Sequence, residues 1–188
     1  NLMMDTKTSY AKSVSCLRPE TAQGLITEFK NVHRFHGESL PFGMCQIGRV
    51  YRKEINPKPF IRLREFEQAE IEFFYDPQAL CTIPLNNKDY EVCKINIFSA
   101  HEQEFGNYDP IICCFKLSDV VQNLSVHPYI AYFMYKIWTL CRYLSMDPKR
   151  VRFRQHLKNE LAHYSSDCWD LEYLVRDTST KLNEVSDK

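Results

Sequence analysis

The sequence predicts an α+β fold in which a mostly antiparallel sheet is flanked by helices. Residues 43–76 are typical of two strands joined by a polar loop, AsnProLysPro at 56–59, because proline cannot extend a strand ladder. Apolar side chains recur at helical spacing in residues 22–33 and again in residues 130–144. These three stretches favour a β-hairpin with helices packed behind it.

Composition narrows the class of protein. The 188 residues have a net charge of +0, which neither supports nor excludes a nucleic-acid partner, because a local basic face can still bind phosphates. With 44% hydrophobic and 13% aromatic residues, the chain is expected to fold. No apolar run reaches the length of about 18 residues that a membrane span needs, and no signal peptide is evident. We therefore expect a cytoplasmic protein with no membrane partner, although the abrupt start at Asn1 leaves room for an upstream targeting segment.

Cysteine spacing indicates the redox compartment. The eight cysteines are Cys16, Cys45, Cys81, Cys93, Cys113, Cys114, Cys141 and Cys168. None forms a CxxC pair, and most lie within apolar segments. We expect reduced core residues in a reducing compartment rather than disulfides or zinc ligands.

One face of the hairpin carries the candidate chemistry. By a period of two, that face of the second strand carries Arg62, Arg64, Phe66, Gln68, Glu70, Glu72 and Phe74. Arg52 and Glu54 share a face of the first strand by the same parity. A guanidinium pair suits a polyphosphate, an aromatic ring suits a purine, and paired carboxylates suit an ammonium. The face therefore predicts a ligand with phosphates, a purine and an amine; the alternative is a hairpin surface of ordinary salt bridges.

Several strings carry a family resemblance. Arg52-Lys53-Glu54, a loop, and then Arg62 and Phe66 resemble the second signature motif of class II aminoacyl-tRNA synthetases. Three longer strings resemble glycyl-tRNA synthetases of the dimeric, eukaryotic-like type: CLRPETAQG at 16–24, REFEQAEIEFF at 64–74, and RFRQHLKNELAHY at 152–164 followed by DCWDLEY. The Arg-x-Glu motif alone indicates the superfamily, whereas RPETAQG and RFRQH indicate glycine.

The resemblance implies an activity with two steps. Glycine and ATP would give glycyl-adenylate and pyrophosphate, and the glycyl group would then pass to tRNA(Gly). ATP would be the co-substrate, Mg²⁺ would bridge its phosphates with no protein metal ligand expected, and the complete protein would be a homodimer. Two alternatives stay open: a non-catalytic synthetase-like binding module, and a class II synthetase for another small amino acid.

The resemblance also implies roles for residues of the ATP site. Arg52 would be the catalytic residue that holds the α-phosphate and the attacking carboxylate. Glu54 would contact the adenine side, Phe66 would stack on the ring, and Arg62 would meet the γ-phosphate. Arg64 would be a second cation, unless it pairs with a neighbouring glutamate.

Glycine would be bound by carboxylates. By resemblance, Glu20 and Glu70 would receive the ammonium of glycine, and Gln68 would help to shape that pocket. For Glu20, the alternative is a helix N-terminal carboxylate that binds no ligand. Lys58, in the hairpin loop, would contact the acceptor end of the tRNA.

The predicted organisation has four parts. Residues 1–75 would be the first part of the catalytic core, with the motif hairpin at 43–75 and a loop-like flank before Leu17. Residues 76–147 would be an insertion of mixed strand and helix, residues 148–175 the continued core, and residues 176–188 a loop or tail. The first and third class II motifs and an anticodon-binding domain are not visible, so the sequence corresponds to part of a synthetase. The apolar stripe expected to face the core is Ile130, Phe133, Met134, Ile137, Leu140, Cys141 and Leu144.

Overall fold

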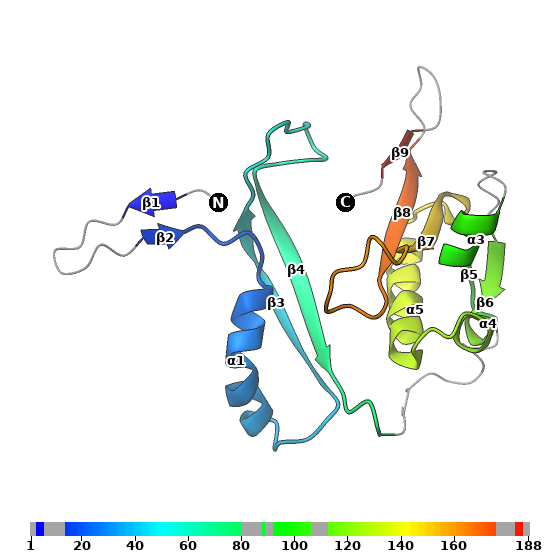
Figure 1. Ribbon diagram of the computed structural model, residues 1–188, viewed down its shortest axis with the longest axis horizontal. Coiled ribbons are helices and arrows are strands. Elements are labelled where there is room, and N and C mark those ends of the chain that lie inside the picture. The colour runs from blue at the N-terminus through cyan, green and yellow to red at the C-terminus, as the bar shows by residue number, and fades with distance from the viewer. Residues whose placement is uncertain are drawn as a thin grey trace. The chain divides into compact units, whose positions relative to one another are not determined.

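The computed structural model describes residues 3–5, 14–79, 88, 92–106, 113–175 and 183–185. The chain forms two compact units, Asn1–Leu80 and Cys81–Lys188. Both contain helices and antiparallel strands (Figure 1), so the predicted α+β class is confirmed. Among the described residues, no helix combines the length and the apolar character needed to cross a bilayer.

The first unit is a helix packed on a hairpin. Its elements are β1 (Met3–Asp5), β2 (Val14–Cys16), α1 (Ala22–Phe35), β3 (Phe42–Tyr51) and β4 (Glu65–Phe74). β1 pairs with β2 and β3 pairs with β4, both antiparallel. The flank before Leu17 was expected to be a loop, and the β1–β2 ribbon shows that this expectation was wrong for both strands.

Helix α1 covers the end of the hairpin that lies away from the connecting loop (Figure 1). Leu25 is buried against Phe42 and Met44, and the ring of Phe29 lies 5.7 Å from that of Phe42 and 4.6 Å from that of Phe74. The helix ends at Phe35 because Gly37 adopts a left-handed conformation with φ of 74°. The predicted helix is thus confirmed, and its apolar face packs as expected except at Ile26, which is exposed.

The second unit is built on a five-stranded sheet. Its strand order is β6-β5-β7-β8-β9, with bounds Cys113–Lys116, Lys94–Phe98, Val151–Gln155, Trp169–Val175 and Asn183–Val185. β5 and β7 are parallel, and the other pairs are antiparallel. The helical elements are α3 (Ala100–Phe105), α4 (Leu117–Asn123), α5 (Pro128–Tyr143) and the 3₁₀ turn η1 (Pro148–Arg150).

This sheet joins segments that the sequence analysis separated. β5 and β6 come from the predicted insertion 76–147, whereas β7 and β8 come from the predicted core segment 148–175. The structure groups them in one unit, and the assignment of 76–147 as an insertion stays a prediction. β9 lies in the stretch expected to be a loop or tail. A strand of three residues is too short to show a period, and pairing with β8 defines it.

The core of the second unit corrects the predicted face of α5. The buried cluster contains Ile95, Ile97, Leu117, Val120, Val126, Ala131, Met134, Trp138, Cys141, Val151 and Phe153. Met134 and Cys141 are buried as expected, but Ile137, Leu140 and Leu144 are exposed. The buried stripe is rotated toward Trp138, because the large indole contributes more apolar area to the core than the aliphatic chains beside it.

The described cysteines are free thiols of differing exposure. Cys141 is buried and Cys93 and Cys168 are half-buried, whereas Cys16, Cys45 and Cys114 are exposed. The expectation of a core position was therefore wrong for the last three. Cys45 lies on an exposed face of its strand, so its apolar neighbours in the sequence do not bury it. Cys81 and the side chain of Cys113 lie outside the described residues.

A buried ion pair crosses the face of β7 and β8. Arg152 Nε donates to Glu172 Oε2 at 2.7 Å, and the two side chains are 15% and 9% exposed. The guanidinium also lies over the ring of Phe98, with Cζ 4.4 Å from the centroid. Desolvated charges are tolerated when they are paired in this way, and removing one partner is costly.

Glu172→Ala should therefore lower the free energy of unfolding of the second unit by about 3 kcal/mol. Both tryptophans, Trp138 and Trp169, belong to this unit. Tryptophan fluorescence during denaturation with guanidinium chloride consequently reports its stability. Glu104→Ala, at an exposed position of α3, is the control, with an expected change within about 0.5 kcal/mol. Equal effects of the two substitutions would contradict a stabilising role for the Glu172 carboxylate.

Candidate functional site

The register of the hairpin places three predicted site residues on one face. β3 and β4 pair Gln46 with Glu70, Gly48 with Gln68, and Val50 with Phe66. Paired residues of an antiparallel ladder share a face. Phe66, Gln68 and Glu70 therefore follow one another on the face whose far end is covered by α1.

At the loop end of the hairpin, both strands are shorter than the sequence pattern predicted. β3 ends at Tyr51 and β4 begins at Glu65, so Arg62 and Arg64 precede the strand. The Arg52 N–H still donates to the Arg64 carbonyl at 2.9 Å, which continues the register by one pair. Lys58 and Arg62 then bond each other's backbone, both at 2.9 Å, in a turn at the tip. The prediction that Arg62 continues the strand face is wrong, because prolines 57 and 59 end the ladder before it.

The carboxylate of Glu70 meets the start of α1. The backbone N–H of Thr21 donates to Glu70 Oε2 at 2.7 Å, and the Thr21 hydroxyl donates to the same oxygen. Gln68 Nε2 donates to Thr21 Oγ1 at 3.3 Å. A carboxylate from the neighbouring strand thus satisfies a backbone donor at the positive end of the helix.

These bonds determine how Glu70 ionises. Burial raises its pKa, but hydrogen bonds from Thr21, Gln68 and the Ala22 backbone outweigh burial, so the pKa lies below the ordinary value of 4.5. Its contribution to stability is complete above that ordinary value and is lost as the pH falls through the lowered one. Burial and the charge of Glu70 raise the pKa of Glu72, the next carboxyl on the same face.

Arg52 and Phe66 come together nearer the loop. Arg52 Nε donates to the Pro19 carbonyl at 3.2 Å, and its Cζ lies 5.3 Å from the centroid of the Phe66 ring. Arg64 Nε donates to the Glu54 carbonyl at 3.1 Å. Glu65 accepts instead from Arg49, on the opposite face, at 2.8 Å. Glu20 is half-buried and immediately precedes Thr21.

The structure therefore brings the predicted residues together in groups. Glu70 and Gln68 meet through Thr21, Arg52 meets Phe66, and Arg64 meets the backbone of Glu54. Lys58 and Arg62 are exposed in the turn at the tip and bond each other there. Their roles in ligand binding stay predictions.

Sequence reasoning missed Arg18, which anchors the segment before α1. Arg18 Nε donates to the Arg49 carbonyl at 2.9 Å, and the Arg18 carbonyl accepts from the Tyr51 N–H at 2.9 Å. The guanidinium lies over Gly48, where a Cβ would meet Nη2 at 2.2 Å. A glycine inside a strand permits the close approach of another group, and at Gly48 the group that approaches is this arginine. The one available signal was a glycine inside a strand.

Gln46 joins the same network. In the amide orientation that satisfies its neighbours, its nitrogen donates to the Thr21 carbonyl at 3.1 Å and its oxygen accepts from Arg18 Nη1 at 3.2 Å. Residues 18–21 are thus attached to β3 by Arg18 and Gln46 and to β4 by Glu70.

An α+β unit whose antiparallel hairpin presents arginines, an aromatic ring and a held carboxylate fits the class II aminoacyl-tRNA synthetase core that the sequence resembles. The family model for the tRNA synthetase class II core domain (G, H, P, S and T) matches residues 7–120. The chain belongs to this family, and the predicted resemblance is confirmed.

Relatives with curated names are glycine–tRNA ligases. The chain is 40% identical over 167 residues to one from Methanothrix thermoacetophila, a match that covers 85% of the chain and 27% of the relative. It is 41% identical over 180 residues to one from Methanococcus maripaludis strain C5, covering 92% and 31%. A protein of Arabidopsis thaliana with the name "Putative glycine--tRNA ligase, cytoplasmic" is 38% identical over 178 residues, covering 92% and 37%. The chain thus spans roughly a third of the length of these relatives.

Gly48→Ala should displace the flexible end of the Arg18 side chain and lower the free energy of unfolding of the first unit by about 1 kcal/mol, the usual net contribution of a lost hydrogen bond. Gly43→Ala in the same strand is the matched control. Its Cβ would meet Phe73 at an ordinary 3.5 Å, and loss of a strand glycine is otherwise neutral or stabilising. Hydrogen exchange of the peptides that contain α1 and β3 measures both variants. Equal protection in Gly48→Ala and Gly43→Ala would show that Arg18 does not anchor the strand.

Proposed function

We propose that the protein that carries this chain is a glycine–tRNA ligase. It activates glycine with ATP to form glycyl-adenylate and transfers the glycyl group to tRNA(Gly). The observation that carries the proposal is the order of groups on one hairpin face: Glu70 held at the start of α1, then Phe66 stacked with Arg52 toward the loop. Membership in the class II core family and the names of the relatives support it.

Glycine is bound at the start of α1. Both bonds from Thr21 go to Oε2 of Glu70, so we assign Oε1 to the ammonium of glycine, together with Glu20. The lowered pKa of Glu70 supports this role, because an ionised carboxylate binds an ammonium most strongly. Gln68 orients Thr21 and, being on the same face as Glu70, helps to shape the glycine pocket.

ATP is bound nearer the loop. Phe66 stacks on the adenine, Glu54 contacts its edge, and Arg52 neutralises charge as the glycine carboxylate attacks the α-phosphorus and the bond to pyrophosphate breaks. Arg62 and Arg64 bind the departing phosphates. Mg²⁺ fits a site of this composition, since phosphate oxygens supply its ligands and few protein oxygens are needed. When bound, it would neutralise part of the pyrophosphate charge.

The remaining assignments concern partners and location. In the second step the 3′-terminal hydroxyl of the tRNA attacks the glycyl carbonyl and AMP leaves. Lys58, exposed in the turn at the tip of the hairpin, contacts the acceptor end. We assign the protein to the cytoplasm and to a homodimer. The name of the Arabidopsis relative supports the location, and the resemblance to the dimeric type supports the dimer.

ATP–pyrophosphate exchange with glycine, alanine and serine tests the function. Exchange that depends on glycine is expected. Exchange with alanine or serine instead would assign the chain to another class II synthetase. No exchange, with retained binding of a glycyl-adenylate analogue in calorimetry, would indicate a binding module and overturn the catalytic proposal.

Arg52→Ala should lower the rate of exchange by about 10²–10³-fold, the usual effect of removing one charge-stabilising donor. The fold should persist, because Arg52 is exposed. Arg49→Ala is the matched control: Arg49 lies three residues away on the opposite face, 57% exposed and paired with Glu65. Similar losses in both variants would contradict a catalytic role for Arg52, and loss of cooperative unfolding in Arg52→Ala would assign it a structural role.

Glu70→Gln should raise the KM for glycine by at least about tenfold and leave the KM for ATP within about twofold. The amide oxygen can still accept from Thr21, while the negative charge that attracts the ammonium is gone. Glu67→Gln, exposed on the opposite face, should change neither constant. If Glu70→Gln raised the two KM values equally, the carboxylate would not be an ammonium site.

A further inference from the structure

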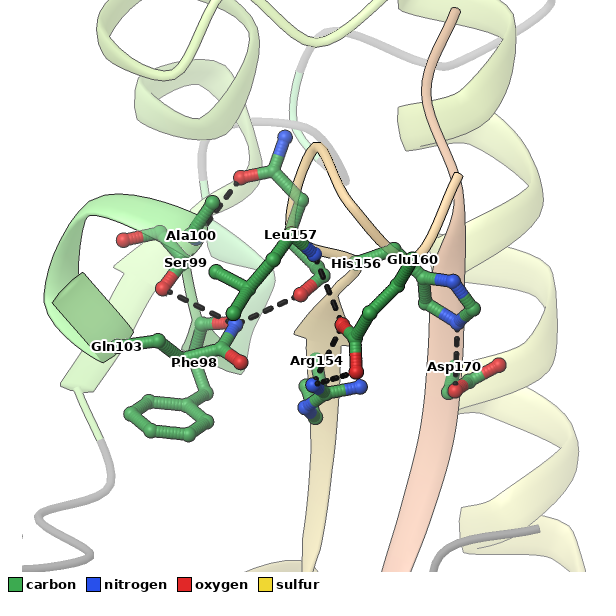
Figure 2. A network of polar contacts seen from close by, with 10 residues as sticks. Phe98, Ser99, Ala100, Gln103, Arg154, His156, Leu157, Glu160 and Asp170 are labelled. Carbon is green, nitrogen blue, oxygen red and sulfur yellow. Dashed lines mark hydrogen bonds and ion pairs between the residues drawn. The ribbon is translucent and has the colours of Figure 1, made fainter. Parts of the chain in front are cut away.

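Three side chains capable of binding a metal converge at one end of the β7–β8 ladder, in the second unit. They are His156, Cys168 and Asp170, and one ligand atom from each lies within 4.8 Å of the other two. His156 Nε2 lies 2.8 Å from Asp170 Oδ2 (Figure 2). All three residues are half-buried, so water is partly excluded from the site.

The pairing of β7 with β8 brings these three residues together. β7 and β8 pair Arg154 with Asp170 and Gln155 with Trp169. The His156 N–H donates to the Cys168 carbonyl at 2.9 Å, so the ladder continues for one more pair. Cys168 directly precedes β8, two residues before Asp170, and continues the face of Asp170; His156 directly follows β7 and lies opposite Cys168 on that face. Asp170 lies within β8, and the other two ligands are the first residues beyond the strand ends, so the sheet limits their movement.

The carboxylate of Asp167 accepts three hydrogen bonds that fix the segment just before β8. Its Oδ1 accepts from Gln155 Nε2 and from the Cys168 N–H, both at 3.0 Å, and its Oδ2 accepts from Trp169 Nε1 at 2.8 Å. These bonds attach the segment before β8 to the end of β7. The position of Cys168 is thereby determined without any metal, as expected of a preorganised site.

The neighbouring cation is already neutralised. Arg154 lies opposite Asp170 in the register, but its Nη2 donates to both oxygens of Glu160, at 2.9 and 2.7 Å (Figure 2). The Leu157 N–H and Arg154 lower the pKa of Glu160, which keeps that carboxylate charged. Arg154 is therefore paired with Glu160 and not with Asp170, whose carboxylate lies against His156.

We propose that His156, Cys168 and Asp170 bind a divalent transition-metal ion, for which Zn²⁺ is the best fit. Imidazole, thiolate and carboxylate are the usual ligands of zinc in proteins, and a mixed set with sulfur disfavours Mg²⁺ and Ca²⁺. Three protein ligands leave one tetrahedral position for water or another donor. The inference is independent of the proposed ligase function, and it revises for Cys168 the expectation that no cysteine binds zinc.

The geometry needs modest adjustment. With bonds of about 2.0–2.3 Å, the ligand atoms of a tetrahedral zinc lie about 3.3–3.8 Å apart. The His156–Asp170 separation would open by roughly half an ångström, and the Cys168 sulfur would move inward by side-chain rotation. Burial, followed by the charges of Asp170 and Asp167, raises the pKa of the free Cys168 thiol. When the metal–sulfur bond forms, the thiol proton is released to solvent.

A metal at this position would cross-link the end of β7 to the start of β8. The loop between them, residues 157–167, would be closed by coordination as well as by hydrogen bonds. Binding to the folded state alone should stabilise the second unit.

Titration of the reduced chain with Co²⁺ tests the site directly. We expect one equivalent to give the visible d–d bands of tetrahedral cobalt and a near-ultraviolet thiolate charge-transfer band, and Zn²⁺ to abolish both. Cys168→Ser should lose the charge-transfer band. Cys114→Ser, at an exposed cysteine of the same unit, should keep it. Absence of the band in the wild type, or its persistence in Cys168→Ser, would overturn the proposal.

Asp170→Asn provides a second test that leaves every thiol in place. Its affinity for Co²⁺ should fall by about tenfold or more, and Zn²⁺ should raise the Tm of the wild type but not that of Asp170→Asn or Cys168→Ser. Tryptophan fluorescence follows unfolding, since Trp169 lies between Cys168 and Asp170 in the sequence. Equal Tm increases in the wild type and both variants would place the metal elsewhere and contradict the assignment.

Discussion

The bonds between Glu70 and Thr21 join the helix of the first unit to its hairpin at the place where the site begins. The acceptor lies in the middle of β4 and the donors lie at the start of α1, 49 residues earlier in the chain. A helix start needs acceptors for its free N–H groups, and this one uses a carboxylate of the neighbouring strand. The contact that stabilises the start of the helix therefore also orients the Glu70 carboxylate, to which we assign the ammonium of glycine.

The contact between Glu70 and Thr21 divides the hairpin face into an apolar end and a polar end. On one side of it, Phe42 and Met44 are covered by Leu25 and Phe29, and this apolar end supplies the packing that orders the unit. On the other side the face carries the half-buried ring of Phe66, with the exposed guanidinium of Arg52 over it. The apolar packing and the residues that we propose to bind ligands thus occupy different ends of one pair of strands, which explains how a polar array can be displayed on an ordered hairpin.

Much of this arrangement could be predicted, and the errors have physical causes. The period of two correctly placed Phe66, Gln68 and Glu70 together, because alternation is a local property of an extended chain. It failed for Arg62, where the turn closed by Lys58 replaces the ladder. The stripe expected on α5 was rotated, because several apolar residues surround that helix and only packing against the sheet selects Trp138.

The sequence by itself determined the α+β class, the hairpin with its polar face, and the strings that place the chain among class II synthetases. These properties depend on residues close together in the chain or on their types. Only the tertiary structure decided that Arg18 lies over Gly48, that Thr21 holds Glu70, and that His156 meets Cys168 at the end of a ladder. Such contacts depend on register and on packing between distant segments, which no local period specifies.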